Sequence, residues 1–217
     1  MPEPSIKGTI FGPVAEEIHA LRESGRISED ELAAALEAKD IALLEAKTVA
    51  SAWYPIDTYA RYLELLCRLE GGGKPAYFER RGSMSARRLM DAGLYSQLDL
   101  LGSITDEPER VGEDARQRAR RAYRSKLTVV ISLAGSIYNV GRWKVIDDAK
   151  HPERVAIEIR EADAYSDGMA GAIVGFLDEC AHSVNRRVQK LYRFERPTRD
   201  RIIVWMLQDL SELRGKR

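Results

Sequence analysis

The chain has 217 residues, 44% of them apolar and 31% charged, and its 34 basic residues balance its 34 acidic residues. This composition is typical of a soluble globular protein, and the balanced charge gives no argument for a nucleic-acid or membrane partner. The apolar runs are shorter than the roughly 20 residues that cross a bilayer, and the N-terminal MPEPSIKGTIFG does not have the pattern of a signal peptide. We therefore expect a cytoplasmic protein without a membrane span.

Residues 1–139 have the pattern of a mainly helical region. Apolar residues recur at helical spacing, and helix-ending signals separate the runs. Ser28 and Glu31 form a capping-box signature, which predicts that a helix begins there. The helices predicted in this region are Val14–Glu23, one opened by Ser28 that carries Leu32, Leu36, Leu43 and Leu44, one that follows Pro55 and ends at the Gly71–Gly73 run, Pro75–Met90, and Glu113–Tyr138.

The pattern changes to that of a sheet over residues 140–210. Strands are predicted at Trp143–Val145, at the alternating run Arg154–Arg160, at Val188–Phe194 and at the apolar run Arg201–Leu207. A helix with small residues at Gly168, Gly171 and Gly175 separates the two pairs, and we interpret these glycines as packing residues that let a neighbouring backbone approach closely. We therefore predict an α+β fold, with a helical N-terminal portion packed on a four-stranded antiparallel sheet of ββαββ order. No linker is long enough to divide the chain, so one domain over 1–217 is expected.

The sequence contains no recognisable catalytic or metal-binding pattern. Its histidines are His19, His151 and His182, and none has a partner at chelating spacing. The patterns of a nucleophile elbow and of a phosphate-binding loop are also missing. Cys67 and Cys180 each lie in an apolar run and are expected to be core thiols. We predict neither a cofactor nor a metal, and expect a protein that is not an enzyme.

Two clusters of arginine are candidates for binding an anionic partner. One opens the predicted helix at Glu113, and the other flanks the last two strands. If the fold brought them together, they could contact phosphate groups. The residues singled out are Arg116, Arg120, Arg124, Arg186, Arg187 and Arg193. The alternative interpretation, which we favour, is ion pairing with the acidic helices.

Aromatic residues gather around Pro55. Aromatics at helical spacing are more often core residues than ligand contacts, but a cavity between helices and a sheet is a common ligand site. Both interpretations stay open at Trp53, Tyr54, Tyr59 and Tyr62.

Several motifs resemble those of a family of myxobacterial paralogous proteins, which is related to heme-NO-binding and vinyl-reductase-like (TRAPP-type) ligand-binding domains. They are KGTIFG at 7–12, WYP at 53–55 with the following YARYLELL, ARRLMDAGLY at 86–95, GRW at 141–143, SDGMAGAIVGFL at 166–177, and IIVWML at 202–207. The resemblance implies helices packed on a four-stranded antiparallel sheet, and a sensing or scaffolding role.

The resemblance also raises the question of heme, because the heme-binding relatives use a proximal histidine and a YxSxR motif. Tyr123–Leu127 supplies the tyrosine and the serine but has Leu127 in place of the arginine. No histidine lies between His19 and His151, where the ligand is expected. The comparison thus argues against heme.

Two functions of different classes follow from the sequence. The leading hypothesis is a non-enzymatic sensory or regulatory module that binds a small apolar ligand or a protein partner. The alternative is a binder of nucleic acid or of an anionic surface through the arginine clusters, which we consider less favoured. A homodimer formed through the apolar ends of helices, such as 127–133, is also possible.

Overall fold

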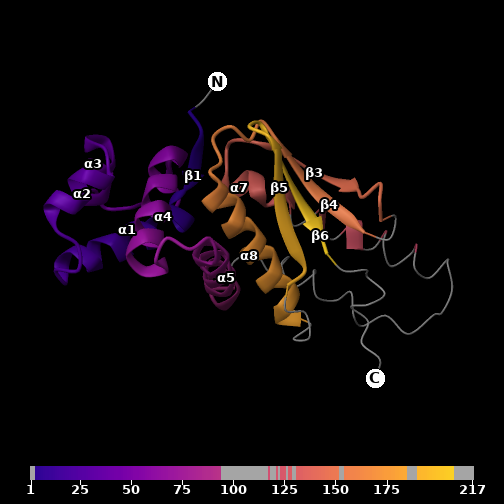
Figure 1. Cartoon of the computed structure of the whole chain (residues 1–217), viewed down its shortest axis with the longest axis horizontal. Helices are drawn as coiled ribbons and strands as arrows, with labels where there is room; N and C mark the ends of the chain where they lie inside the picture. The colour runs from indigo at the N-terminus through magenta and orange to yellow at the C-terminus, as the bar shows by residue number, and fades with distance from the viewer. Residues whose placement is uncertain are drawn as a thin grey trace.

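The computed structural model describes residues 3–93, 117, 121, 123–125, 127–128, 131–151, 154–184 and 190–207. Its N-terminal part is mainly helical, with a short two-stranded sheet (Figure 1). The elements of this part are β1 Ser5–Lys7, α1 Gly8–Glu23, α2 Glu29–Ala35, α3 Ala38–Glu45, β2 Trp53–Pro55, α4 Ile56–Gly71 and α5 Ala76–Asp91.

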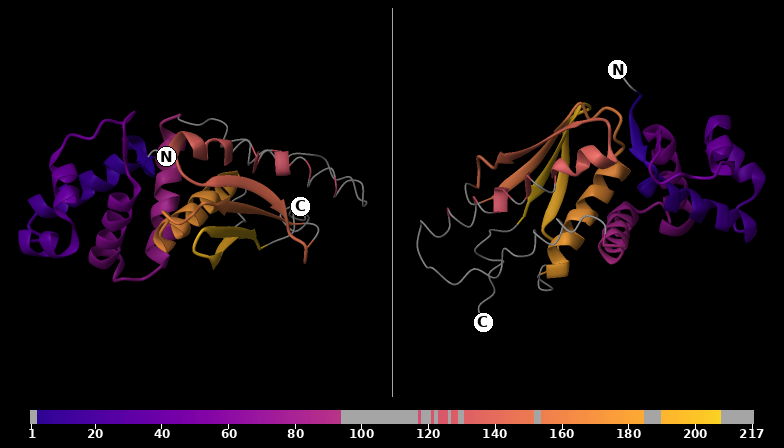
Figure 2. Two further views of the ribbon diagram at one scale, coloured as in Figure 1. Left: turned by 90° about the horizontal axis from the view of Figure 1, so that it is seen from above. Right: turned by 180° about the vertical axis from the view of Figure 1, so that it is seen from behind.

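The C-terminal part is an antiparallel sheet with a helix on one face (Figures 1 and 2). Its elements are α7 Ala134–Ile137, β3 Arg142–Asp147, β4 Val155–Arg160, α8 Asp167–Val184, β5 Tyr192–Thr198 and β6 Arg201–Met206. The strand order β3-β4-β6-β5 puts the apolar β6 in the middle of the sheet. The predicted α+β class and the ββαββ order are confirmed.

Local signals in the sequence explain where several helices begin and end. The Ser28 hydroxyl accepts the Glu31 N–H at 3.2 Å, and the Glu31 carboxylate accepts the Ser28 N–H at 2.8 Å, so the predicted capping box is present. The helix α4 ends where Gly72 takes a left-handed conformation, with φ of 58°.

Some boundaries differ from the prediction. The helix α1 begins at Gly8 and runs through Pro13. The helix opened by Ser28 stops after Ala35, because Glu37 and Asp40 form a second capping box that starts α3. The strand β5 extends to Thr198, beyond its predicted end at Phe194, and the turn to β6 lies at Arg199–Asp200. The short strands β1 and β2 were not predicted.

The helices α5 and α8 pack side by side between the two parts (Figures 1 and 2). Their backbones touch at two glycines. A Cβ atom at Gly82 would lie 1.9 Å from the Ala172 carbonyl oxygen, and one at Gly175 would lie 1.8 Å from the Glu79 carbonyl oxygen. The glycine spacing predicted close packing along this helix, and the contact with α5 confirms it. We call this contact the α5–α8 seam.

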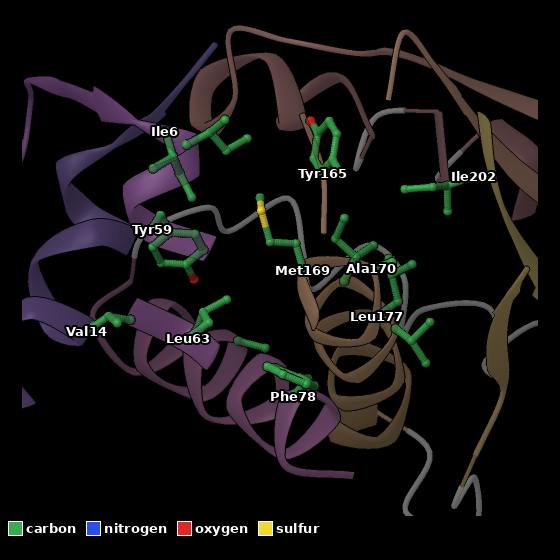
Figure 3. Packing of buried hydrophobic residues seen from close by; sticks show 14 of the residues in the cluster. Ile6, Val14, Tyr59, Leu63, Phe78, Tyr165, Met169, Ala170, Leu177 and Ile202 are labelled. Carbon is green, nitrogen blue, oxygen red and sulfur yellow. The ribbon is translucent and has the colours of Figure 1, made fainter. Parts of the chain in front are cut away.

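One buried apolar cluster extends from α1 to β6 and includes both cysteines (Figure 3). Cys67 and Cys180 are both buried in this core, as predicted. The N-terminal strand ties the two parts together, because Ile6 pairs with Tyr138 and Ser5 exchanges hydrogen bonds with Asn139. No helix among the described residues is long and apolar enough to cross a membrane.

Candidate ligand-binding cavity

A cavity of about 80 Å³ lies beside the α5–α8 seam. Four structural regions supply most of its wall: α5, α8, the residues just before β3, and the start of β3. The lining residues are Ile10, Tyr59, Gly82, Ser85, Ile131, Leu133, Ala134, Ile137, Tyr138, Trp143, Ala172, Ile173, Phe176 and Leu177. The cavity is partly open to the surface, because lining residues such as Tyr138, Trp143 and Phe176 are only half-buried.

The helices leave this space open through the sizes of the residues they present. On α8, Ala172 and Phe176 are four residues apart, as are Ile173 and Leu177, so the two pairs form one apolar stripe. On α5 the facing residues are the small Gly82 and Ser85. Large side chains therefore line one side of the cavity, and small ones fail to fill it from the other.

An aromatic group forms the wall nearest the sheet. Tyr138 and Trp143 are stacked with ring centroids 5.9 Å apart, and Tyr165 lies 5.4 Å from Tyr138. The Tyr165 hydroxyl donates a hydrogen bond of 2.8 Å to the Val140 carbonyl, which fixes the backbone between the two other rings. The Trp143 indole nitrogen is buried and has no hydrogen-bond partner among the described residues.

Tyr59 brings a polar group from α4 to the cavity. Figure 3 shows its hydroxyl directed away from the α4 backbone into the interior. Burial raises the pKa of Tyr59 to about 12, although nearby Arg81 acts in the opposite direction. Burial also raises the pKa of Tyr138, and the proximity of Tyr59 and Tyr165 adds to the shift. Both phenols are therefore neutral at physiological pH.

An ion pair between Arg81 and Glu17 lies close to Tyr59. The Arg81 side chain is 8% exposed and pairs with the Glu17 carboxylate. Burial raises the pKa of Glu17, and Arg81 opposes that shift. The nearby Glu70 carboxylate raises the pKa of Glu17 further, and because none of these three charged residues lines the cavity, the cavity wall itself carries no charge.

The structure separates the four aromatics predicted as ligand contacts. Tyr59 lines the cavity, whereas Tyr54 stacks on Phe11 with centroids 4.4 Å apart. Tyr62 is buried and donates a hydrogen bond of 2.5 Å to the Asp40 carbonyl. Trp53 is 41% exposed, with the Lys7 ammonium 4.1 Å from its ring centroid. The structure therefore brings Tyr59 alone of the four to this site.

Most of the arginine clusters lie outside the described residues, namely Arg116, Arg120, Arg186 and Arg187. Arg124 donates to the Asp147 carboxylate at 2.5 Å and to the Val145 carbonyl at 3.1 Å. Arg193 pairs with Glu195 at 3.1 Å. Both described arginines are thus engaged in ion pairs within the chain.

The lining of the cavity does not supply the histidine ligand that the heme-binding relatives use. None of the three histidines lines the cavity. Leu127, which stands where the YxSxR motif needs arginine, is a fully buried core residue.

The sequence reasoning missed most of the cavity wall. Tyr138 and Trp143 were placed at the end of a helix and in a strand, without a role in binding. The small residues of α8 were interpreted as packing residues, which they are at Gly175, but Ala172 on the same helix lines the cavity. One feature of the sequence could have indicated the cavity, namely small residues on α5 and α8 together with aromatic residues just before and within β3.

Comparisons with known proteins found distant structural neighbours. An Fe(II) unliganded H-NOX mutant from K. algicida is 11% identical with a TM-score of 0.49, covering 95% of this chain and 100% of its own. An H-NOX mutant of T. tengcongensis is 10% identical, with a TM-score of 0.48 and coverage of 94% and 99%. An H-NOX protein from S. oneidensis in the Fe(II)NO state is 11% identical, with a TM-score of 0.46 and coverage of 94% and 100%.

No family model and no curated protein matches the chain. All three neighbours are H-NOX proteins. At these scores, however, the likeness carries no information about ligands. What the chain binds has to follow from its own residues.

Proposed function

We propose that this chain is a non-enzymatic binding module whose cavity holds a small, mainly apolar molecule. The observation that carries the proposal is the cavity itself, an apolar space of about 80 Å³ beside the α5–α8 seam. It has about half the volume of an engineered apolar cavity of roughly 150 Å³ that takes up benzene or xenon. A ligand of a few non-hydrogen atoms matches this size.

The composition of the wall supports binding rather than catalysis. Among the described residues, no carboxylate, histidine, cysteine, lysine or arginine lines the cavity. Ser85, Tyr59 and Tyr138 bring hydroxyl groups to the wall, but a hydroxyl nucleophile needs an adjacent general base to activate it, and none of the basic groups named above lines the cavity. The described residues also contain no group of His, Cys, Asp or Glu that could hold a metal ion.

The position of the cavity supports a regulatory role. Ile131, Ala134 and Ile137 line it from the segment that is tied to β1 and leads into β3. An occupant would brace this segment against α8, so that binding alters the balance between conformations of the junction. We propose that a partner protein recognises this change in the conformation of the junction.

The experiment is a titration of the protein with isobutene, an apolar probe of four carbon atoms, followed by methyl NMR. We expect saturable shifts of the Ile131, Ile173 and Leu177 methyl signals. Ala134→Leu, which places a larger side chain at the cavity wall, should abolish these shifts. Gly135→Ala is the matched control, because a Cβ atom there would have no other atom within 4 Å.

The proposal fails if isobutene shifts no methyl signal of the cavity, or if Ala134→Leu binds the probe as well as the parent protein. Either result would leave the space without a ligand role.

A further inference from the structure

The buried tyrosines of this protein differ in how their hydroxyl groups are satisfied. Most of them bond within the protein: Tyr54 to the Val49 N–H, Tyr62 to the Asp40 carbonyl, Tyr165 to the Val140 carbonyl, and Tyr123 to Tyr192. Tyr59, Tyr77 and Tyr138 have no hydrogen-bond partner among the described residues. Tyr59 and Tyr77 are buried and Tyr138 is half-buried, and a buried hydroxyl without a partner costs roughly 1–3 kcal/mol, so these residues need an explanation.

The three unpartnered hydroxyls fall into two kinds. The Tyr77 hydroxyl is sealed from any probe the size of water, as is the Trp143 indole nitrogen. The hydroxyls of Tyr59 and Tyr138 are not sealed in this way, and both residues line the cavity. Tyr59 is only 5% exposed overall, so the open space at its hydroxyl is the cavity.

The electrostatic surroundings define what these hydroxyls can bind. Both phenols are neutral, because burial raises the pKa of each, and each can donate one hydrogen bond and accept others. The wall carries no charge, because neither Arg81 nor its partner Glu17 lines the cavity. An ion would lose its hydration here without gaining a counter-charge.

We propose that the ligand is a neutral small molecule that carries one polar oxygen, as in a ketone, aldehyde or alcohol, and that the Tyr59 and Tyr138 hydroxyls bind this oxygen. The remaining atoms of the ligand lie against the apolar side chains of Ile131, Ile173 and Leu177. This inference rests on the proposed function and adds to it the chemical class of the ligand.

The test compares two probes of the same shape. Acetone has a carbonyl oxygen where isobutene has a methylene group. Only acetone can therefore accept a hydrogen bond from a tyrosine hydroxyl. Both are titrated into the parent protein and into Tyr59→Phe and Tyr138→Phe, with methyl NMR as the readout. Tyr77→Phe is the control, since it removes an unpartnered hydroxyl that the cavity does not reach.

We expect Tyr59→Phe or Tyr138→Phe to weaken acetone binding roughly fivefold to tenfold, which is the effect of one lost hydrogen bond. Isobutene binding should stay within about twofold in the same variants, and Tyr77→Phe should change neither probe. Because the ratio of the two affinities is measured within each variant, a general loss of stability does not mimic the effect.

Two other outcomes are distinct. If isobutene binds but the tyrosine variants leave the ratio of acetone to isobutene unchanged, the hydroxyls hold only water. The inference about the polar oxygen is then wrong, while the proposed function stands. If isobutene does not bind to the parent protein, the proposed function fails and this inference fails with it.

Discussion

The α5–α8 seam and the cavity beside it are made by the same two helices. At the seam the two backbones are in contact, whereas at the cavity the helices leave a space between them. At the seam, glycine lets a carbonyl oxygen of each helix approach the backbone of the other. At the cavity, α8 presents Ile173, Phe176 and Leu177, and α5 presents only Gly82 and Ser85. The comparison shows that close packing at one point of a helix pair can hold a neighbouring space open.

The largest effect is expected from breaking the seam. Gly175→Ala would put a methyl group 1.8 Å from the Glu79 carbonyl oxygen, so the helices must move apart. We expect a loss of about 3 kcal/mol in the free energy of unfolding, as for severe overpacking of a core. Denaturant unfolding measures it.

Gly171→Ala on the same helix is the matched control, because its new Cβ would meet only the Phe78 Cβ, at 3.2 Å. We expect it to change stability by less than about 1 kcal/mol. Equal losses in the two variants would show that the backbone contact at the seam is not what holds the helices together.

A smaller effect is expected at the opposite side of α8, where Asp178 anchors the start of β5. Its carboxylate accepts the N–H groups of Leu191 and Tyr192 at 2.8 and 2.9 Å. Burial raises the pKa of Asp178 from 3.8 to about 6, although these two hydrogen bonds act in the opposite direction.

The raised pKa fixes the sign of the pH dependence. The stability that Asp178 contributes is fully present below the unfolded value of 3.8 and is lost as the pH rises through about 6. Acidification from about pH 7 to about pH 5 should therefore stabilise the protein by about 1 kcal/mol, after allowance for solvent screening. Thermal unfolding at both pH values measures this. Asp178→Asn should remove the gain, and a gain that persists in this variant would assign it to another group.

The smallest effect is expected from filling the cavity. Ala134 is 8% exposed and lines the space, so Ala134→Leu adds apolar atoms where none pack now. We expect a gain of roughly 0.5–1 kcal/mol in the free energy of unfolding, because part of the burial gain offsets the cost of fitting the side chain. A loss of more than about 1 kcal/mol in thermal or denaturant unfolding would mean that the space is not available to a side chain.

The sequence predicted the layout of the molecule well where the pattern is local. The alternation at Arg154–Arg160, the capping box at Ser28 and the glycine spacing of α8 each specify an element through neighbouring residues. The break between α2 and α3 was missed, because a glutamate at the first position of a capping box is a weaker signal than serine. The strands β1 and β2 were missed because three residues carry no periodicity.

The cavity could not be predicted in the same way. Its wall combines residues as distant as Ile10 and Leu177, and a space depends on what large side chains leave unfilled. Tyr59 was named because it lies in an aromatic run, but Tyr54 and Tyr62 belong to the same run and bond to the backbone instead. Which tyrosine keeps a free hydroxyl is decided by tertiary contacts that no spacing in the sequence encodes.

Whether the cavity can hold a small apolar molecule is tested most directly by diffraction from crystals of the protein under xenon pressure. Xenon enters apolar cavities of suitable size and is visible by its anomalous signal. We predict a xenon peak among Ile131, Ala134 and Leu177 in the parent protein, and its loss in Ala134→Leu. If crystals of the parent protein show no xenon at this position, the cavity does not take up a small apolar molecule.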